Sequence, residues 1–266
     1  MTTSEVPELP EVEHAARVLR SAAVGKSVRK LRVLHRAQRR HLPPRAIARV
    51  RGARIVSVDR RGKHQLLSLS TGDTLVVHFR MTGDWLVDEV VAPVPKYVRV
   101  AIELDDGVRI SLVDPRALST VTLHRDGSTV LPALGPDPTD PSLSVATFGE
   151  ALSRRRVSIK VALLDQRVLA GVGNIYAAEA LWLARIDPRT VASSLRRARQ
   201  ARLLEAIRSV LAKAQRLSAG RYAEDGEGRF EVYDREGLPC SRCGTAIRRI
   251  VQAARSTYYC PHCQRR

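Results

Sequence analysis

Aromatic residues are scarce in this chain, and long apolar runs are missing. Only 4% of the 266 residues are Phe, Trp or Tyr although 44% are hydrophobic, so the cores must be built mainly from Val, Leu, Ile and Ala. No apolar run approaches the ~20 residues that a membrane-spanning helix needs, which excludes a transmembrane protein. The sequence also shows no secretory signal and no internal repeat, and we expect a cytoplasmic protein.

Negative charge is the second shortage. The 27 acidic residues are outnumbered by 45 Lys and Arg, which gives a net charge of +18 and a pI near 10.8. A surplus of this size indicates a polyanionic partner, most simply nucleic acid, bound through neutralisation of its phosphates. The alternative is an arginine-rich composition inherited from a GC-rich genome.

Cysteine is confined to two pairs near the C-terminus, Cys240-x2-Cys243 and Cys260-x2-Cys263, separated by 16 residues. Four thiolates at this spacing suit one tetrahedral, structural Zn2+, with the spacer forming a β-hairpin. The alternative is four reduced, free cysteines. The segment from Cys240 onward holds six Arg and no acidic residue, so the hairpin is also a candidate DNA contact. We expect His262 to be exposed and not a ligand.

The first half of the chain predicts an antiparallel β-sandwich that a helix precedes. Pro10 and the acidic residues around it favour a helix start, and apolar residues at helical spacing continue to Ala23, with Gly25 as the C-terminal cap. Alternating or hairpin-bounded strands are predicted at residues 27–34, 53–58, 65–70, 74–79, 98–104, 108–113 and 121–123. We assign residues 7–131 to this domain.

The second half predicts helices and then the cysteine module, so the fold class is α+β. Residues 132–145, with four prolines between 132 and 141, are predicted to be a linker. Helices are predicted at 146–152, 158–164, 174–184 and 195–216 within a domain spanning 146–231. Its last part, 218–231, is predicted to be a flexible loop, and 237–266 to be a zinc finger.

The two ends of the chain together resemble one family. Pro7-Glu8-Leu9-Pro10-Glu11-Val12-Glu13 resembles the N-terminal signature of the bacterial formamidopyrimidine-DNA glycosylases, and the finger with its hairpin sequence, residues 252–260, is similar to theirs. By itself the first stretch is equally a well-capped helix. Matching motifs run in family order from Pro7 to Cys263, and the resemblance implies a helix–two-turn–helix domain between the sandwich and the finger.

The resemblance also implies catalytic residues. Pro7 would attack the sugar through a free N-terminal amine, and Glu8 would act as general acid–base, with Glu11 helping to hold the site. Lys63, in the basic turn 60–64, would hold a phosphate and assist β-elimination. Arg255 would reach the phosphates at the lesion, and the alternative is one more solvated arginine.

Further residues would contact DNA. Met81 would fill the gap left by an everted base, although a core position explains it equally well, and Arg116 would pair with the orphaned base. Tyr97 stands where the family has a DNA-contacting histidine. The basic stretch 154–160 and the turn 171–176 resemble phosphate-binding segments, which implicates Arg155, Lys160 and Asn174. We expect N–H groups at the start of the helix after this turn to grip a phosphate, although a tight interhelical turn would look the same.

The chain departs from the family in three places. Six residues precede Pro7, and an amide nitrogen cannot attack a sugar; either the enzyme is inactive, or translation starts at Val6 on a GTG codon and removal of the initiator methionine exposes Pro7. Ala117-Leu118-Ser119 replaces the usual Arg-Phe-Gly after Arg116. The loop 217–232 is shorter than the family's lesion-capping segment and lacks its threonines, which leaves the lesion preference open.

These observations predict a base-excision-repair DNA glycosylase with AP lyase activity that removes oxidised purines through a Schiff base on Pro7. We expect one structural Zn2+, damaged double-stranded DNA as partner, no membrane association, a monomer, and a bacterial cytoplasmic location near the nucleoid. A catalytically silent DNA-binding protein of the same fold is the alternative. A zinc-finger regulator unrelated to repair is a third possibility.

Overall fold

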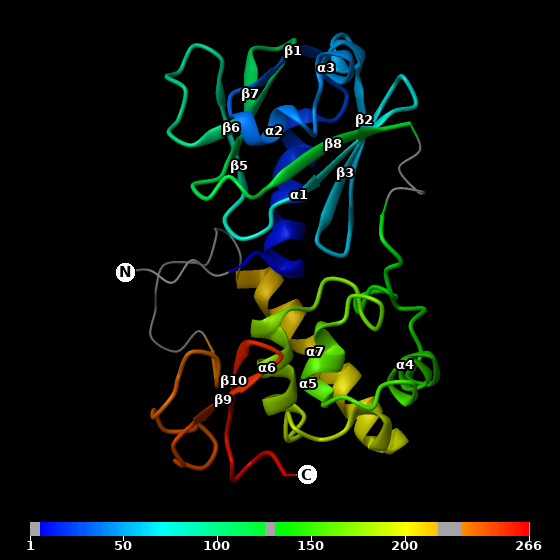
Figure 1. Cartoon of the computed structure of the whole chain (residues 1–266), viewed down its shortest axis with the longest axis vertical. Coiled ribbons are helices and arrows are strands. Elements are labelled where there is room, and N and C mark those ends of the chain that lie inside the picture. The colour runs from blue at the N-terminus through cyan, green and yellow to red at the C-terminus, as the bar shows by residue number, and fades with distance from the viewer. Residues whose placement is uncertain (1–5, 126–130, 218–229, 266) are drawn as a thin grey trace. The chain divides into compact units, whose positions relative to one another are not determined.

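The computed structural model describes residues 6–125, 131–217 and 230–265 (Figure 1). The chain divides into two compact units. The first, or N-terminal unit, comprises residues up to Pro7 together with Glu11–Pro132. The second, or C-terminal unit, comprises Glu8–Pro10 together with Ala133–Arg266. The division therefore falls inside the first helix, α1 (Leu9–Ala23).

The N-terminal unit contains two four-stranded antiparallel sheets. One has the order β1-β6-β7-β5, formed by Val28–Val33, Val98–Leu104, Val108–Val113 and Asp84–Glu89. The other has the order β2-β3-β4-β8, formed by Ile55–Arg61, His64–Leu69, Thr74–His78 and Thr120–His124. This arrangement confirms the predicted β-sandwich.

Two glycine turns fix the register of neighbouring strands. Gly72 between β3 and β4 has a φ of 79°, and Gly107 between β6 and β7 has a φ of 85°. Residues with side chains adopt this left-handed region at a cost, so glycine at these points directs the chain into a hairpin. The β6/β7 pairing aligns Ile102 with Ile110, and both side chains are fully buried.

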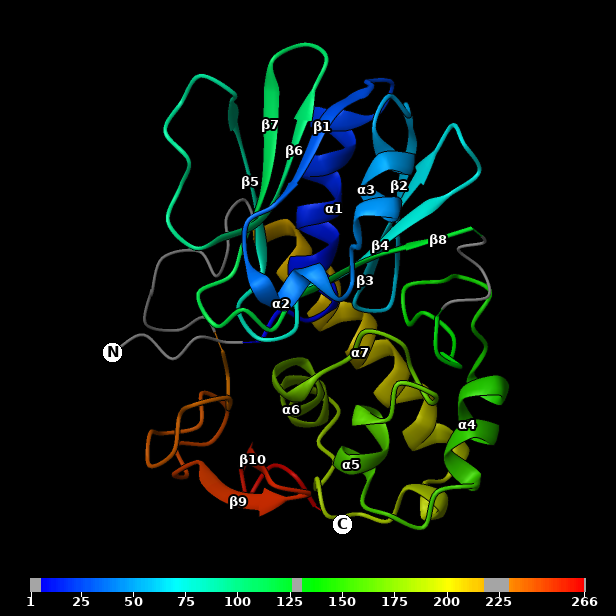
Figure 2. The same ribbon diagram turned by 45° about the horizontal axis from the view of Figure 1, so that its top comes forward.

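Helix α1 supplies its apolar stripe to the core of this sandwich. Val12, Ala15, Ala16 and Leu19 are buried together with residues from both sheets. Figure 2 shows α1 running between the sheets. Gly25 follows the helix with a φ of 87°, as predicted for its C-terminal cap.

Three elements of this unit were not predicted. Strand β5, with the sequence DWLVDE, was missed because its acidic ends and the exposed Leu86 weaken the alternation, although Trp85 is buried and the strand pairs with β7. The helices α2 (Arg36–Arg39) and α3 (Pro44–Val50) are too short to show a clear helical period.

The C-terminal unit is a helical bundle followed by a hairpin. Its helices are α4 (Val145–Ser153), α5 (Ile159–Leu164), α6 (Asn174–Leu183), the 3-10 turn η1 (Ala192–Ser194) and α7 (Arg197–Leu217). The hairpin pairs β9 (Arg248–Gln252) with β10 (Arg255–Tyr259), as predicted for the spacer between the cysteine pairs. Helices, sheets and this hairpin together confirm the α+β class.

The segment predicted as a linker, 132–145, makes hydrogen bonds within the C-terminal unit. The guanidinium of Arg208, on α7, donates to the carbonyl oxygens of Pro138, Asp140 and Leu143 at 2.8–3.0 Å. The predicted flexible loop 218–231 lies almost wholly outside the described residues. Among the described helices, none is both long and apolar enough to cross a membrane.

Candidate functional site

The acidic N-terminal motif is anchored at the start of α6. The Glu8 carboxylate accepts hydrogen bonds from the backbone N–H groups of Gly173 (2.9 Å), Ile175 (2.8 Å) and Tyr176 (3.3 Å). Glu8 is only 2% exposed. These donors and the positive end of the helix dipole stabilise the negative charge of the carboxylate.

The expectation that these N–H groups grip a phosphate was therefore wrong for these three donors. A helix start leaves its first N–H groups without partners inside the helix, and here a carboxylate of the same chain satisfies them. No local sequence pattern indicates this contact, because Glu8 and Gly173 are 165 residues apart.

Gly171 lets the N-terminal segment approach this turn closely. Its φ is 95°, and a Cβ atom placed on it would lie 2.7 Å from the Leu9 side chain. The N–H of Leu9 donates to the Gly171 carbonyl oxygen at 3.1 Å. The glycine is thus required twice, for its backbone conformation and for the space it leaves.

A buried lysine lies in the same unit. Lys160, on α5, is fully buried, and its Nζ donates to Oδ1 of Asn174 at 2.8 Å. The Nδ2 of Asn174 donates in turn to the Ser256 carbonyl oxygen at 3.0 Å, next to Arg255. The pKa of Lys160 is lowered to about 8, because burial outweighs the opposing negative charge of Glu8 and the positive charge of Arg255 adds to the effect of burial.

Arg255 itself is exposed at the start of β10. The two residues before it, Ala253 and Ala254, have φ values of 47° and 59°, which make a tight turn of a kind that usually contains Asn or Gly. Arg155, the other basic candidate of this unit, donates to Asp165 at 3.1 Å.

In the N-terminal unit, Lys63 lies in the turn between β2 and β3, beside two histidines. His64 and His78 pair across β3 and β4, with ring centroids 4.7 Å apart. The pKa of His78 is lowered to about 3, mainly by burial and in addition by the positive charges that His64, Arg80 and Lys63 can carry. Both rings are therefore neutral near pH 7, because burial also lowers the pKa of His64.

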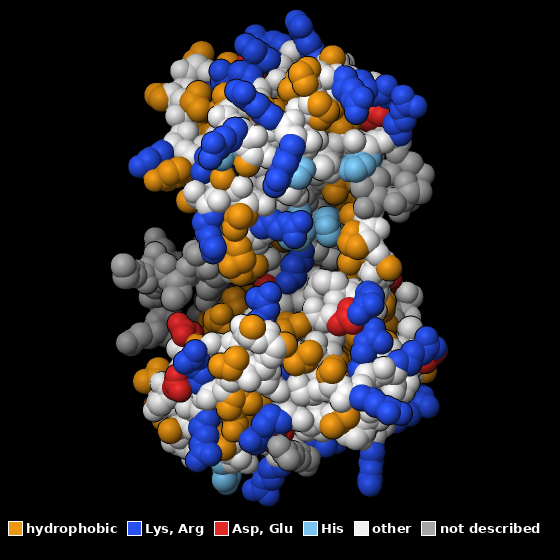
Figure 3. Space-filling view, viewed as in Figure 1, with side chains coloured by type: hydrophobic (Ala, Val, Ile, Leu, Met, Phe, Trp, Pro, Cys, Tyr) orange, Lys and Arg blue, Asp and Glu red, His pale blue; other side chains and the backbone are white. Residues whose placement is uncertain are grey.

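The remaining DNA-contact candidates of this unit are exposed or half-buried. Met81 is half-buried, and Arg116 is exposed on the loop between β7 and β8. Tyr97 is 44% exposed with a φ of 67°, and the Nζ of Lys96 lies 4.8 Å from its ring centroid. In Figure 3, lysine and arginine side chains cover much of the viewed face of each unit, and acidic ones are few.

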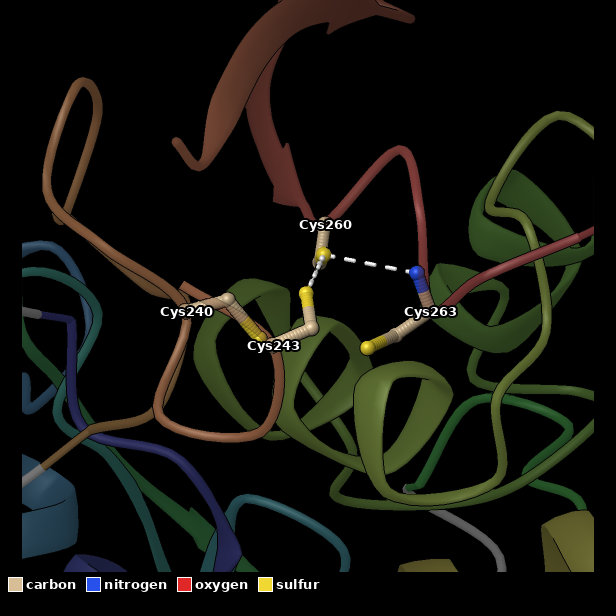
Figure 4. Close-up of side chains that lie close together, drawn as sticks. All are labelled: Cys240, Cys243, Cys260 and Cys263. Carbon is tan, nitrogen blue, oxygen red and sulfur yellow. Dashed lines mark hydrogen bonds between the residues drawn. The ribbon is translucent and has the colours of Figure 1, made fainter. Parts of the chain in front are cut away.

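The four cysteines converge as the spacing predicted. Their sulfur atoms all lie within 4.8 Å of one another, with Sγ of Cys243 3.5 Å from Sγ of Cys260 (Figure 4). A tetrahedral zinc with Zn–S bonds of about 2.3 Å requires sulfur atoms about 3.8 Å apart, so this donor set fits the metal. His262 is exposed and outside the cluster, as expected.

The helix α6 connects this centre to the bundle through a residue that the sequence did not reveal. The indole Nε1–H of Trp182 donates to Sγ of Cys240 at 3.4 Å. The guanidinium of Arg242 lies 3.6 Å from the Trp182 ring centroid and donates to the Trp182 carbonyl oxygen at 2.7 Å. Such contacts orient a ligating thiolate and lower its electron density.

A second residue of α6 was also missed. The Glu179 carboxylate accepts hydrogen bonds from the backbone N–H groups of Glu231, Val232 and Tyr233 at 2.9–3.0 Å. Burial raises the pKa of Glu179 despite these donors. A signal existed, because Glu179 is the one charged residue in the mainly apolar α6 sequence NIYAAEALWL.

Comparisons with known proteins agree with this arrangement. The family model described as the formamidopyrimidine-DNA glycosylase N-terminal domain matches residues 6–121, the formamidopyrimidine-DNA glycosylase H2TH domain matches 134–224, and the zinc finger found in FPG and IleRS matches 237–266. The formamidopyrimidine-DNA glycosylase of Chloroflexus aggregans is 45% identical over 273 residues, covering 97% of this chain and 98% of the relative.

Solved structures are similar over nearly the whole chain. The Lactococcus lactis Fpg bound to DNA containing an abasic site has a TM-score of 0.88 and 31% identity, covering 97% of this chain and 100% of that one. A MutM protein bound to DNA containing carbocyclic 8-oxo-G has a TM-score of 0.89 and 31% identity, covering 98% and 100%. The chain belongs to the formamidopyrimidine-DNA glycosylase family, and its four cysteines form the structural zinc site of that family's finger.

Proposed function

We propose that this protein is a bifunctional DNA glycosylase and AP lyase that removes oxidised purines from damaged double-stranded DNA. Membership of the family supports this proposal, as do the DNA lesions bound by the similar solved proteins. The net charge of +18 favours binding to the phosphate backbone.

The observation that carries the proposal is the anchoring of Glu8. Its carboxylate is held by three N–H groups of the α6 start, and the N–H of Leu9 is held by Gly171. Pro7 directly precedes Glu8, so the hydrogen bonds that hold Glu8 and Leu9 also restrain the position of Pro7. A nucleophile in such a place is positioned without a further loss of entropy when substrate binds.

The chemistry requires the Pro7 nitrogen as a free secondary amine. A damaged base is first turned out of the duplex. The amine then attacks C1′ of the deoxyribose, the bond between C1′ and the base breaks, and an iminium forms between nitrogen and C1′ after the sugar ring opens. The iminium acidifies the protons at C2′; loss of one of them to a base expels the phosphate oxygen at C3′ and cuts the strand.

Glu8 is the group that would move protons in these steps. A carboxylate held by N–H donors also stabilises the positive charge that develops at the sugar and at the iminium nitrogen. Glu11 would help to hold the site. Lys63 and Arg255 would hold phosphates beside the lesion and assist the elimination.

The other candidate residues would bind DNA. Met81 and Arg116 would occupy the space of the everted base, and Tyr97 and Arg155 would contact the backbone. Lys160 and Asn174, which are hydrogen-bonded to each other, would support the turn at residues 171–176 from inside the unit.

We further propose that translation starts at Val6. The match to the family's N-terminal domain begins at residue 6, immediately before Pro7, which supports this start. A free α-amino group has a pKa of ~8, so an appreciable fraction is nucleophilic at neutral pH.

Borohydride trapping tests the function. A protein that begins at Pro7 is incubated with duplex DNA containing an abasic site and sodium borohydride, which reduces the iminium to a stable amine. We expect a covalent complex that Pro7→Gly abolishes or strongly reduces. Absence of an adduct, with Pro7 verified as the terminus and DNA binding intact, would leave only the silent DNA-binding protein.

A monomeric state and association with chromosomal DNA complete the proposal. Sedimentation experiments without DNA are expected to show a species with the mass of one chain, which is 29.4 kDa for all 266 residues. A species of twice that mass at micromolar concentration would contradict the monomer.

A further inference from the structure

The loop between β7 and β8 presents two exposed side chains on a constrained backbone. Arg116 is exposed, Leu118 is 44% exposed, and Ala117 between them has a φ of 53°. A left-handed alanine persists only where the surroundings impose it. Three buried polar residues, Asp114, Arg99 and Gln38, impose it here.

Asp114 holds the loop from inside. Its side chain is fully buried; Oδ1 accepts from the Thr82 hydroxyl and from the N–H of Arg116 at 3.1 Å, and Oδ2 accepts from the N–H of Ser119 at 2.7 Å. Burial alone would raise the pKa of this carboxyl, but the hydrogen bonds from Ser119 and Thr82 hold it below its ordinary value. The loop is therefore wrapped around an ionised carboxylate.

Arg99 and Gln38 hold the two ends of the loop. The Arg99 guanidinium donates to the carbonyl oxygens of Asp114 (2.6 Å) and Pro115 (3.0 Å). Gln38, on α2, is fully buried; its amide donates to the Ser119 carbonyl oxygen and accepts from the N–H of Val121 at 3.4 Å. Its amide also lies 3.5 Å from the Ser119 hydroxyl.

The three residues, which we call the clasp, also couple this loop to a second turn. Thr82, which donates to Asp114, directly follows Met81. Both proposed insertion side chains, Met81 and Arg116, thus depend on the same buried carboxylate. A rigid arginine distinguishes bases by the positions of their hydrogen-bond acceptors, whereas a mobile one adapts to several.

We propose that Gln38, Arg99 and Asp114 are positioning residues that set how strictly the protein discriminates the base opposite the lesion. This inference rests on the proposed function, because it takes a damaged duplex as the ligand. Loosening the clasp should let Arg116 and Leu118 adopt several orientations, and affinity should then depend less on the opposite base.

Equilibrium binding tests the clasp without requiring catalysis. Dissociation constants are measured by fluorescence anisotropy for duplexes that carry a tetrahydrofuran abasic-site analogue opposite each of the four bases. We expect wild-type protein to prefer one opposite base. Gln38→Leu, which keeps the volume but removes the amide, should reduce the ratio between the best and worst base roughly tenfold, the effect of losing a buried hydrogen bond.

Two further variants make the result decisive. Arg49→Ala removes an ion pair, at 2.8 Å, between the partly exposed Arg49 and the buried Asp73 of the same unit, and it should leave the ratio unchanged even if the melting temperature falls. Arg99→Lys keeps the charge but loses the paired hydrogen bonds to the carbonyl oxygens of Asp114 and Pro115. It replaces Gln38→Leu as the test variant if Gln38→Leu does not fold.

The outcomes separate the two proposals. An unchanged ratio in folded clasp variants, or a wild-type protein that does not distinguish the four duplexes, overturns the role of the clasp. A reduced ratio together with no borohydride-trapped adduct supports the clasp and overturns the catalytic function instead.

Discussion

The anchoring of Glu8 predicts that this residue serves stability as well as chemistry. In Glu8→Gln, one carboxylate oxygen becomes an NH2 group, which cannot accept a hydrogen bond. The best orientation keeps the oxygen toward Gly173 and Tyr176 and turns the NH2 toward the N–H of Ile175. The variant then loses one charge-assisted hydrogen bond, worth about 1.5–3 kcal/mol, and the favourable interaction of a charge with the helix dipole, worth about 0.3–1 kcal/mol.

We therefore expect Glu8→Gln to lower the free energy of unfolding of the C-terminal unit by about 3 kcal/mol. Urea unfolding followed by circular dichroism measures this loss. The matched control is Glu150→Gln on α4 of the same unit, which removes an exposed ion pair with Arg154 and should cost less than about 1 kcal/mol. Equal stabilities of the Glu8→Gln and wild-type proteins would refute the anchoring argument.

The experiment also separates folding from catalysis. Where Glu8→Gln is still folded, a loss of borohydride trapping reports on chemistry alone. Where it is unfolded, the same loss says nothing about a proton transfer.

Three other predictions follow from the C-terminal unit. The pKa of Lys160 is about 8 in the folded protein against 10.5 for an ordinary lysine, so between these pH values the unfolded chain binds a proton that the folded protein does not. The free energy of unfolding of the wild-type protein should therefore rise relative to that of Lys160→Met by up to about 3 kcal/mol from pH 8 to 10.5. A difference between the two proteins in urea unfolding that does not change with pH would contradict this. Ala254→Gly should relieve the left-handed strain and stabilise the hairpin by about 0.5–1 kcal/mol, and a lower melting temperature would count against it. In a Trp85→Phe background, removal of zinc by a chelator should change the Trp182 fluorescence, since its indole contacts Cys240; unaltered emission would disprove that contact.

The strands of the sandwich were predictable because alternation within each segment and turn residues between segments indicated the same boundaries. Alternation set the strands, and glycines such as Gly107 set the turns, so each segment carried its own signal. Strand β5 was missed because its own sequence alternates weakly, and its pairing with β7 is what makes it a strand. The zinc ligands were predictable for the same local reason, since their spacing alone defines the site.

The contacts that complete the sites were not predictable in this way. Glu8 finds its partners 165 to 168 residues further along the chain, and Gln38 reaches Ser119 over 81 residues. Such pairs leave no periodic pattern, and only the assembled fold brings them together. The N-terminal motif thus pointed to Glu8 as a site residue, but not to the N–H groups at the start of α6 that bind its carboxylate.

The most direct test of the account concerns the terminus of the protein made in the cell. Mass spectrometry of the intact native protein should show a chain that begins at Pro7 with an unmodified amine, and this species should be the one that borohydride links to abasic DNA. A native protein that retains residues before Pro7 and still forms the adduct, or one that begins at Pro7 and forms none, would contradict the proposed mechanism.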